Sequence, residues 1–148
     1  MPAIEVRPIT AAETIPLRWS ILRAGLPQET AIFPNDEAET SRHFGAFADG
    51  ELISVATLHQ TPMPGAVEEP LVYQLRGMAT AEKARGWGAG GLLLAACVEE
   101  ARRSGARWLW CNARTPAAGF YEKHGFLRRG DMFEIPTAGP HFLMTRRV

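Results

Sequence analysis

Hydrophobic residues recur along the chain at two different spacings. Segments in which they alternate with polar residues, or stand together over a few positions, predict strands, whereas spacings of three or four predict helices. The predicted strands are residues 4–8, 42–48, 51–58, 71–79, 108–111, 126–128, 132–135 and 141–146, and the predicted helices begin at Ala11, Gly90 and Ala117. This order indicates one α+β domain over residues 1–148, with a mixed, mostly antiparallel sheet flanked by helices.

Capping and turn residues mark the ends of several of these elements. Thr10 followed by Glu13 forms a capping-box pattern that starts the first helix, and Pro16 is expected to kink that helix. The Asp49-Gly50 pair between two strand-like segments predicts a hairpin. Two further segments are expected to be irregular or exposed: residues 26–41, as an irregular loop or a short helix, and residues 68–70, on the surface.

Composition narrows the class of protein. The 148 residues include 16 basic and 16 acidic side chains, so no net charge draws the chain toward nucleic acid or an anionic membrane. Cys97 and Cys111 are predicted to be buried thiols, because neither has metal-ligand spacing to a histidine. The first residues carry no secretion-signal pattern and no segment reaches membrane-spanning length, so the expected location is cytoplasmic.

The segment Arg85-Gly86-Trp87-Gly88-Ala89-Gly90-Gly91 is the strongest chemical signal. It precedes an apolar helix, and the first amides of a helix have no partner within it and carry partial positive charge. Glycines let an anion approach those amides and allow unusual backbone angles. The segment therefore predicts a binding site for a phosphate-bearing ligand.

Two common nucleotide motifs do not fit this turn. It contains the G-x-G-x-x-G pattern, but residues 81–85 separate it from the preceding strand and the next strand carries no carboxylate. A Walker P-loop would end in Gly-Lys-Ser/Thr, whereas this turn ends in Gly90-Gly91-Leu92.

Two segments together resemble the GNAT (Gcn5-related) N-acetyltransferases. Arg85, Gly88 and Gly90 fill the defining positions of that family's pyrophosphate-binding turn, and residues 117–126 resemble its A-x-x-F/L-Y-x-K-x-G-F segment. The resemblance implies a GNAT-like fold and acetyl-CoA as the acyl donor, without a metal. The residues that it implies for cofactor binding are Met78, Ala79, Thr80, Arg85, Gly86, Trp87, Gly88, Ala89, Gly90, Asn112, Arg114 and Phe120.

The resemblance also suggests catalytic residues. Tyr121 matches the family's tyrosine that protonates the leaving thiolate. The strand over residues 72–76 lacks the glutamate that several members use as general base, so a water relay or another residue is expected in that role. His59 and His141 are candidates because imidazole exchanges protons near neutral pH. His141 is preferred because it lies on a late strand, which the resemblance implies to border the acceptor cleft.

The function predicted from these motifs is direct transfer of an acetyl group from acetyl-CoA to the amine of a small molecule. Two alternatives stay open at this point. The acceptor could instead be a protein N-terminus or lysine, or the chain could bind an acyl-CoA as a sensor without turnover. A homodimer is possible, and neither nucleic acid nor membrane is expected as a partner.

Overall fold

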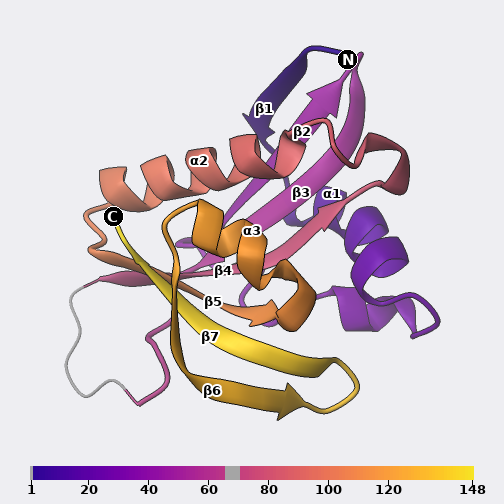
Figure 1. The fold of residues 1–148 in the computed structure, drawn as a ribbon. Coiled ribbons are helices and arrows are strands. Elements are labelled where there is room, and N and C mark those ends of the chain that lie inside the picture. The colour runs from indigo at the N-terminus through magenta and orange to yellow at the C-terminus, as the bar shows by residue number, and fades with distance from the viewer. Residues whose placement is uncertain (1, 66–70) are drawn as a thin grey trace.

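In the computed structural model, which describes residues 2–65 and 71–148, seven strands form one sheet in the order β1-β2-β3-β4-β5-β7-β6 (Figure 1). The strands are β1 (Ile4–Pro8), β2 (Arg42–Ala48), β3 (Glu51–His59), β4 (Val72–Thr80), β5 (Trp108–Arg114), β6 (Leu127–Ile135) and β7 (Gly139–Arg147). The α-helices are α1 (Ala11–Leu17), α2 (Ala89–Arg103) and α3 (Ala118–Lys123). Shorter helical turns cover Arg18–Leu22, Gln28–Ala31, Glu82–Ala84 and Thr115–Ala117. β4 and β5 are parallel, and the other neighbours pair antiparallel.

The local signals of the sequence have the expected outcomes. Thr10 and Glu13 form the capping box, with the Thr10 hydroxyl accepting from the Glu13 amide at 3.2 Å and the Glu13 carboxylate accepting from the Thr10 amide at 2.9 Å. Asp49 and Gly50 both have positive φ, of 51° and 80°, which suits the tight turn between β2 and β3. Pro16 lies inside α1, which continues into a wide π-helical turn at Arg18–Leu22.

Two strand predictions differ from the structure. Residues 126–128 and 132–135 were predicted as strand segments with a gap between them. Residues 127–135 instead form the single strand β6, which pairs with β7 across a register shift between Arg129 and Phe133, and Phe126 precedes it. β5 continues beyond Cys111 to Arg114 because it pairs with β7 along its whole length. Such pairing between distant segments is not visible in local periodicity. Residues 68–70, predicted to lie on the surface, fall outside the described residues.

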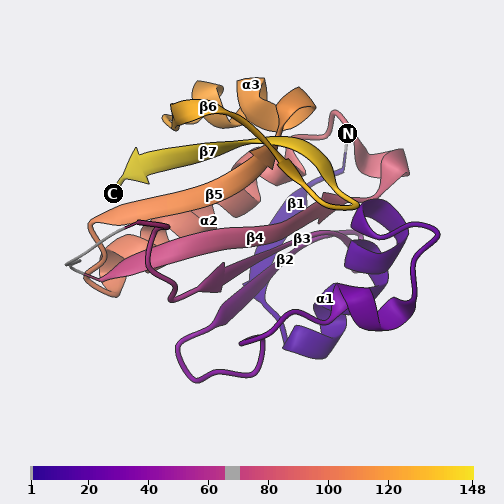
Figure 2. The same cartoon turned by 90° about the horizontal axis from the view of Figure 1, so that it is seen from below.

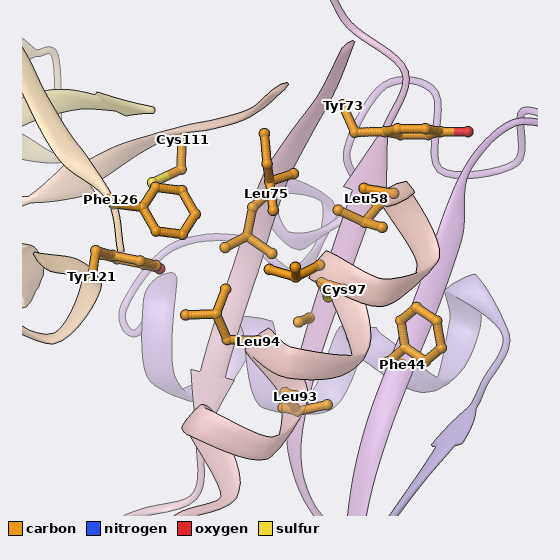
Figure 3. Close-up of a cluster of buried hydrophobic side chains, with 14 of the residues drawn as sticks. Phe44, Leu58, Tyr73, Leu75, Leu93, Leu94, Cys97, Cys111, Tyr121 and Phe126 are labelled. Atoms are coloured by element: carbon orange, nitrogen blue, oxygen red, sulfur yellow. The ribbon is translucent and has the colours of Figure 1, made fainter. Parts of the chain in front are cut away.

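The hydrophobic core lies between α2 and one face of the sheet (Figure 3). Leu93, Leu94 and Cys97 of α2 are buried against strand residues such as Leu58 and Leu75. As predicted, both thiols are buried, and burial raises the pKa of Cys97 and of Cys111 to about 12. None of the described helices is long and apolar enough to cross a membrane.

The opposite face of the sheet is covered by α1 and the segments after it (Figures 1 and 2), and it holds a buried ion pair. Arg18 is fully buried and donates to the Asp36 carboxylate at 2.7 Å and to the Thr57 hydroxyl at 2.7 Å. Burial works to raise the pKa of Asp36, but hydrogen bonds from Arg18 and the Phe33 amide outweigh it and hold the pKa below its usual value. His59 Nε2 lies 3.0 Å from the same carboxylate.

This network packs directly against an irregular point in β4. Gly77 has a φ of +61°, and the pairing of β3 with β4 shifts register between Val55 and Thr57, where Gly77 and Met78 bulge. A Cβ at Gly77 would lie 2.8 Å from Arg18 Nε and 3.0 Å from Phe33 Cε2. Glycine is therefore required here both by the left-handed backbone and by the close approach of Arg18.

We expect Gly77→Ala to destabilise the fold more than the matched change Gly105→Ala. Both glycines have positive φ, and alanine in that region costs about 1–2 kcal/mol. Gly105 has open space where a Cβ would lie, whereas overpacking at Gly77 adds about 1–3 kcal/mol. Urea unfolding of the two variants measures the difference; equal losses of stability would contradict the packing of Arg18 on β4.

The buried His59 predicts a pH dependence of stability. Burial lowers the pKa of His59 below its usual 6.5, although Asp36 opposes the shift. Below pH 6.5 the unfolded chain therefore takes up a proton that the folded chain resists, and the free energy of unfolding should fall between about pH 7 and 5. His59→Gln keeps a donor to Asp36 but cannot titrate, so its unfolding free energy should fall less over that range. A slope identical to that of the wild type would exclude His59 as its source.

Candidate active site

The site begins where the two parallel strands of the sheet separate. β4 pairs with β5 only at Val72–Trp108, Tyr73–Leu109 and Gln74–Trp110, although both strands continue well beyond. Figure 2 shows the two strands starting side by side and then diverging. From Leu75 to Thr80, the edge of β4 that faces β5 has no strand partner among the described residues. Its backbone groups are free to pair with an extended ligand.

A cleft of about 850 Å³ opens beside the end of β4 and the start of α2. Its lining combines the end of β4, the glycine-rich turn and one side of α3. We call this space the donor cleft, after the role proposed for it under Proposed function. It is lined by Ile21, Met78, Ala79, Thr80, Ala84, Arg85, Gly86, Gly88, Ala89, Gly90, Gly91, Leu92, Phe120, Lys123 and His124.

The donor cleft fits an anion at the start of α2. Gly88 caps this 15-residue helix without a side chain, and the amides of Ala89, Gly90 and Gly91 donate to no partner in the described structure. Gly86 and Gly88 have φ of +84° and +86°, with open space where a side chain would lie. Arg85 and Lys123 line the cleft, and its lining contains no carboxylate. These features suit a ligand with phosphate groups.

A second cavity, of about 260 Å³, lies between the separated strands. Its walls come from both strands, from the turn after α1 and from the β6–β7 turn. We call this space the acceptor cavity, after the role proposed for it under Proposed function. It is lined by Leu22, Arg23, Phe33, Gln74, Leu75, Arg76, Gly77, Met78, Cys111, Asn112, Ala113, Arg114, Ala117, Tyr121, Ile135, Ala138 and His141. Met78 lines both spaces, so the donor cleft and the acceptor cavity meet at this residue.

Tyr121 stands at this junction. Its hydroxyl donates to Met78 Sδ at 3.6 Å, and its ring packs edge-on against Phe120 and Phe126. Figure 3 shows Tyr121 at the side of the core next to Phe126 and Cys111. Burial raises the pKa of Tyr121, so the phenol stays protonated at neutral pH. A neutral phenol beside the junction is suited to donate a proton to a more basic group.

His141 lies on β7 and lines the same cavity while remaining almost fully buried. Its Nδ1 is 2.8 Å from the Gly139 carbonyl oxygen, which can only accept, so Nδ1 donates. In the neutral imidazole, Nε2 is then left with a free lone pair that can accept a proton. His59, the other candidate from the sequence, instead contacts Asp36 in the buried network and lines neither space.

The structure brings most of the predicted cofactor residues together. In the donor cleft lie Met78, Ala79, Thr80, Arg85, Gly86, Gly88, Ala89, Gly90 and Phe120. Three others lie elsewhere. Asn112 and Arg114 line the acceptor cavity, because β5 diverges from β4 before reaching them. Trp87 lines neither space and packs against the hydrophobic core.

Several lining residues were not predicted from the sequence. Lys123 and His124 reach the donor cleft from the end of α3, and Lys123 could have been found because it belongs to the motif at residues 117–126. Arg23, Phe33 and Arg76 line the acceptor cavity. Arg23 and Phe33 come from segments with no motif, so no local signal in the sequence marks them. Arg76 lies on the strand predicted over residues 71–79, next to the glycine turn, but nothing local indicates that its side chain lines a cavity.

Comparisons with known proteins agree with this geometry. A model of the Acetyltransferase (GNAT) family matches residues 11–126. The chain is 38% identical over 145 residues to a Bacillus subtilis (strain 168) protein described as the uncharacterized N-acetyltransferase YitI, covering 98% of this chain and 97% of that one.

Two solved structures share the whole fold. A GCN5-related N-acetyltransferase from Kribbella flavida is 26% identical with a TM-score of 0.74, covering 99% of this chain and 98% of the other. A GNAT family acetyltransferase from Elizabethkingia anophelis with acetyl-CoA bound is 20% identical with a TM-score of 0.68, covering 98% of both chains. The family match, which spans most of the chain, and the curated relative lead to one conclusion: the protein is an acyltransferase of the GNAT family.

Proposed function

We propose that this protein transfers an acetyl group from acetyl-CoA to the amine of a small molecule. The observation that carries the proposal is the meeting of two spaces at Met78, one suited to a phosphorylated donor and the other a small cavity for an acceptor. Tyr121 stands where they meet. The acetyl-CoA thioester supplies a carbonyl carbon that the amine attacks as the carbon–sulfur bond breaks.

The donor is held along one path through the cleft. The amides of Ala89, Gly90 and Gly91 and the side chains of Arg85 and Lys123 bind its phosphates. The unpaired edge of β4 from Leu75 to Thr80 pairs with its extended arm. A backbone amide on this edge donates to the thioester oxygen, an interaction whose loss in other enzymes costs about 3 kcal/mol.

Two side chains manage the protons. Tyr121 donates its phenolic proton to the departing sulfur, and its burial keeps that proton in place at neutral pH until the thiolate forms. His141 accepts the proton that the amine loses, through Nε2, directly or through water. His141 thus acts as the general base, a role that several members of the family give to a glutamate at a position where β4 has none.

The shape of the acceptor cavity favours a small molecule over a peptide. Its volume of about 260 Å³ is smaller than the roughly 300–1,000 Å³ of pockets for drug-sized ligands. Leu22 and Arg23 border it on one side, and Ile135 and Ala138 of the β6–β7 turn border it on the other. Walls on both sides suit a compact acceptor and leave little room for a polypeptide.

Acetyl-CoA binding tests the donor cleft. We expect Gly88→Leu to abolish binding, because a side chain there occupies the open space before the α2 amides. Gly105→Leu is the matched control, since it imposes the same backbone strain beyond the other end of α2. Calorimetry should show micromolar affinity for the wild type and for Gly105→Leu. Absence of binding to the wild type, or equal binding by both variants, would contradict this cleft.

Turnover tests Tyr121. Tyr121→Phe should lower kcat about 100-fold, a typical loss for a general acid, while acetyl-CoA affinity stays near that of the wild type. Tyr73→Phe is the control, because Tyr73 is the chain's other tyrosine, is also buried, and lines neither space. Release of the coenzyme A thiol in the presence of amines provides the assay. An unchanged kcat in Tyr121→Phe would remove this residue from the proton transfer.

A further inference from the structure

The acceptor cavity carries a concentrated positive charge. Arg23, Arg76 and Arg114 all line it, and none of its lining residues is an aspartate or glutamate. The chain as a whole has no net charge, so this concentration is local. Cavities lined by charges of one sign attract ligands of the opposite sign.

Two of these guanidinium groups meet at one backbone oxygen. Arg23 Nη1 and Arg114 Nη2 each donate to the Leu22 carbonyl at 3.2 Å. A neutral carbonyl compensates two positive charges poorly. Burial, followed by the charges of Arg114 and Arg18, lowers the pKa of Arg23. Neither Arg23 nor Arg114 forms an ion pair within the described part of the chain.

The third guanidinium, that of Arg76, shares one aromatic ring with Arg23. Arg76 lies 4.2 Å from the centroid of Phe33, and Arg23 lies 5.3 Å from it. Arg18 contacts the same ring at 3.9 Å, but Asp36 neutralises Arg18. Asp36 already pairs with Arg18 and His59, so it does not neutralise the arginines that line the cavity. The half-buried Arg76 also forms no ion pair among the described residues, so the charges that face the cavity remain uncompensated.

We infer that the acceptor is an amine that also carries a carboxylate or a comparable acidic group, which Arg23, Arg76 and Arg114 bind. This inference rests on the proposed function and specifies its acceptor. Arginine presents two parallel N–H donors that match a carboxylate, and such charge-assisted bonds are among the strongest in proteins. The small cavity keeps the acid close to the amine, as in an amino acid. The same arginines repel cationic acceptors such as polyamines.

Paired acceptors test the inference by turnover. Release of coenzyme A is measured with the common amino acids and with their primary amides, and with aminomethylphosphonate and spermidine as phosphonate and cationic probes. We expect kcat/KM at least ten-fold higher for the acids than for their amides. A rate for aminomethylphosphonate equal to that for glycine indicates recognition of charge, and a lower rate indicates recognition of carboxylate shape; both agree with the inference. Equal or faster rates with amides or spermidine would overturn it while leaving the acetyltransferase function intact.

A binding measurement tests the inference of an acidic acceptor separately from the proposed acetyltransferase function. N-acetyl amino acids and their amides are titrated by calorimetry into the protein saturated with coenzyme A, which requires no turnover. We expect at least ten-fold tighter binding of the acids. Equal affinities would overturn the inference, whereas failure of every amine to release coenzyme A would contradict the proposed function instead.

Variants of one arginine distinguish charge recognition from packing. Arg76→Gln should raise KM for the best acid acceptor at least ten-fold and leave KM for acetyl-CoA unchanged, whereas Arg76→Lys should retain much of the affinity. Arg103→Gln is the control, because Arg103 is exposed on α2 and pairs with Glu100. Equal losses in Arg76→Gln and Arg76→Lys, or no loss in either, would contradict a charge contact with the acceptor.

Discussion

The active site depends on the early separation of β4 from β5. These parallel strands share only three residue pairs before they diverge. The divergence leaves one edge of β4 unpaired and opens the two spaces that meet at Met78. At the same point the left-handed backbone of Gly77 packs under the buried Arg18. A buried ion pair, costly on its own, thus supports the strand on which the donor would be bound.

The distribution of charged side chains around the two spaces indicates what kind of ligand each can bind. The chain is neutral overall, yet both spaces are lined by basic side chains and neither is lined by a carboxylate. Asp36 does not line the acceptor cavity and is held by Arg18 and His59. The positive charge is therefore left for bound molecules. A site of this kind is suited to two anionic substrates.

Local chemistry explains how much of this could be predicted from the sequence. The glycine turn, the capping box and the Asp49-Gly50 hairpin are each determined by residues that are neighbours in the chain. Their sequence patterns were therefore sufficient to predict these local structures. Tyr121 could be predicted as a site residue because its motif is continuous in the chain, and it lines the acceptor cavity. The grouping of Arg23, Arg76 and Arg114 arises from three distant segments and leaves no periodic signal. β6 was divided in the prediction for a related reason, since only pairing with β7 makes its exposed residues a strand.

Hydrogen exchange with and without acetyl-CoA tests the central claim most directly, because it reports on individual backbone amides. If the separated edge of β4 and the start of α2 hold the donor, acetyl-CoA should slow exchange at residues 75–80 and 88–92. Exchange at the β2–β3 hairpin, on the other half of the sheet, should remain unchanged. Protection confined to other segments, with 75–80 and 88–92 unaffected, would contradict the account.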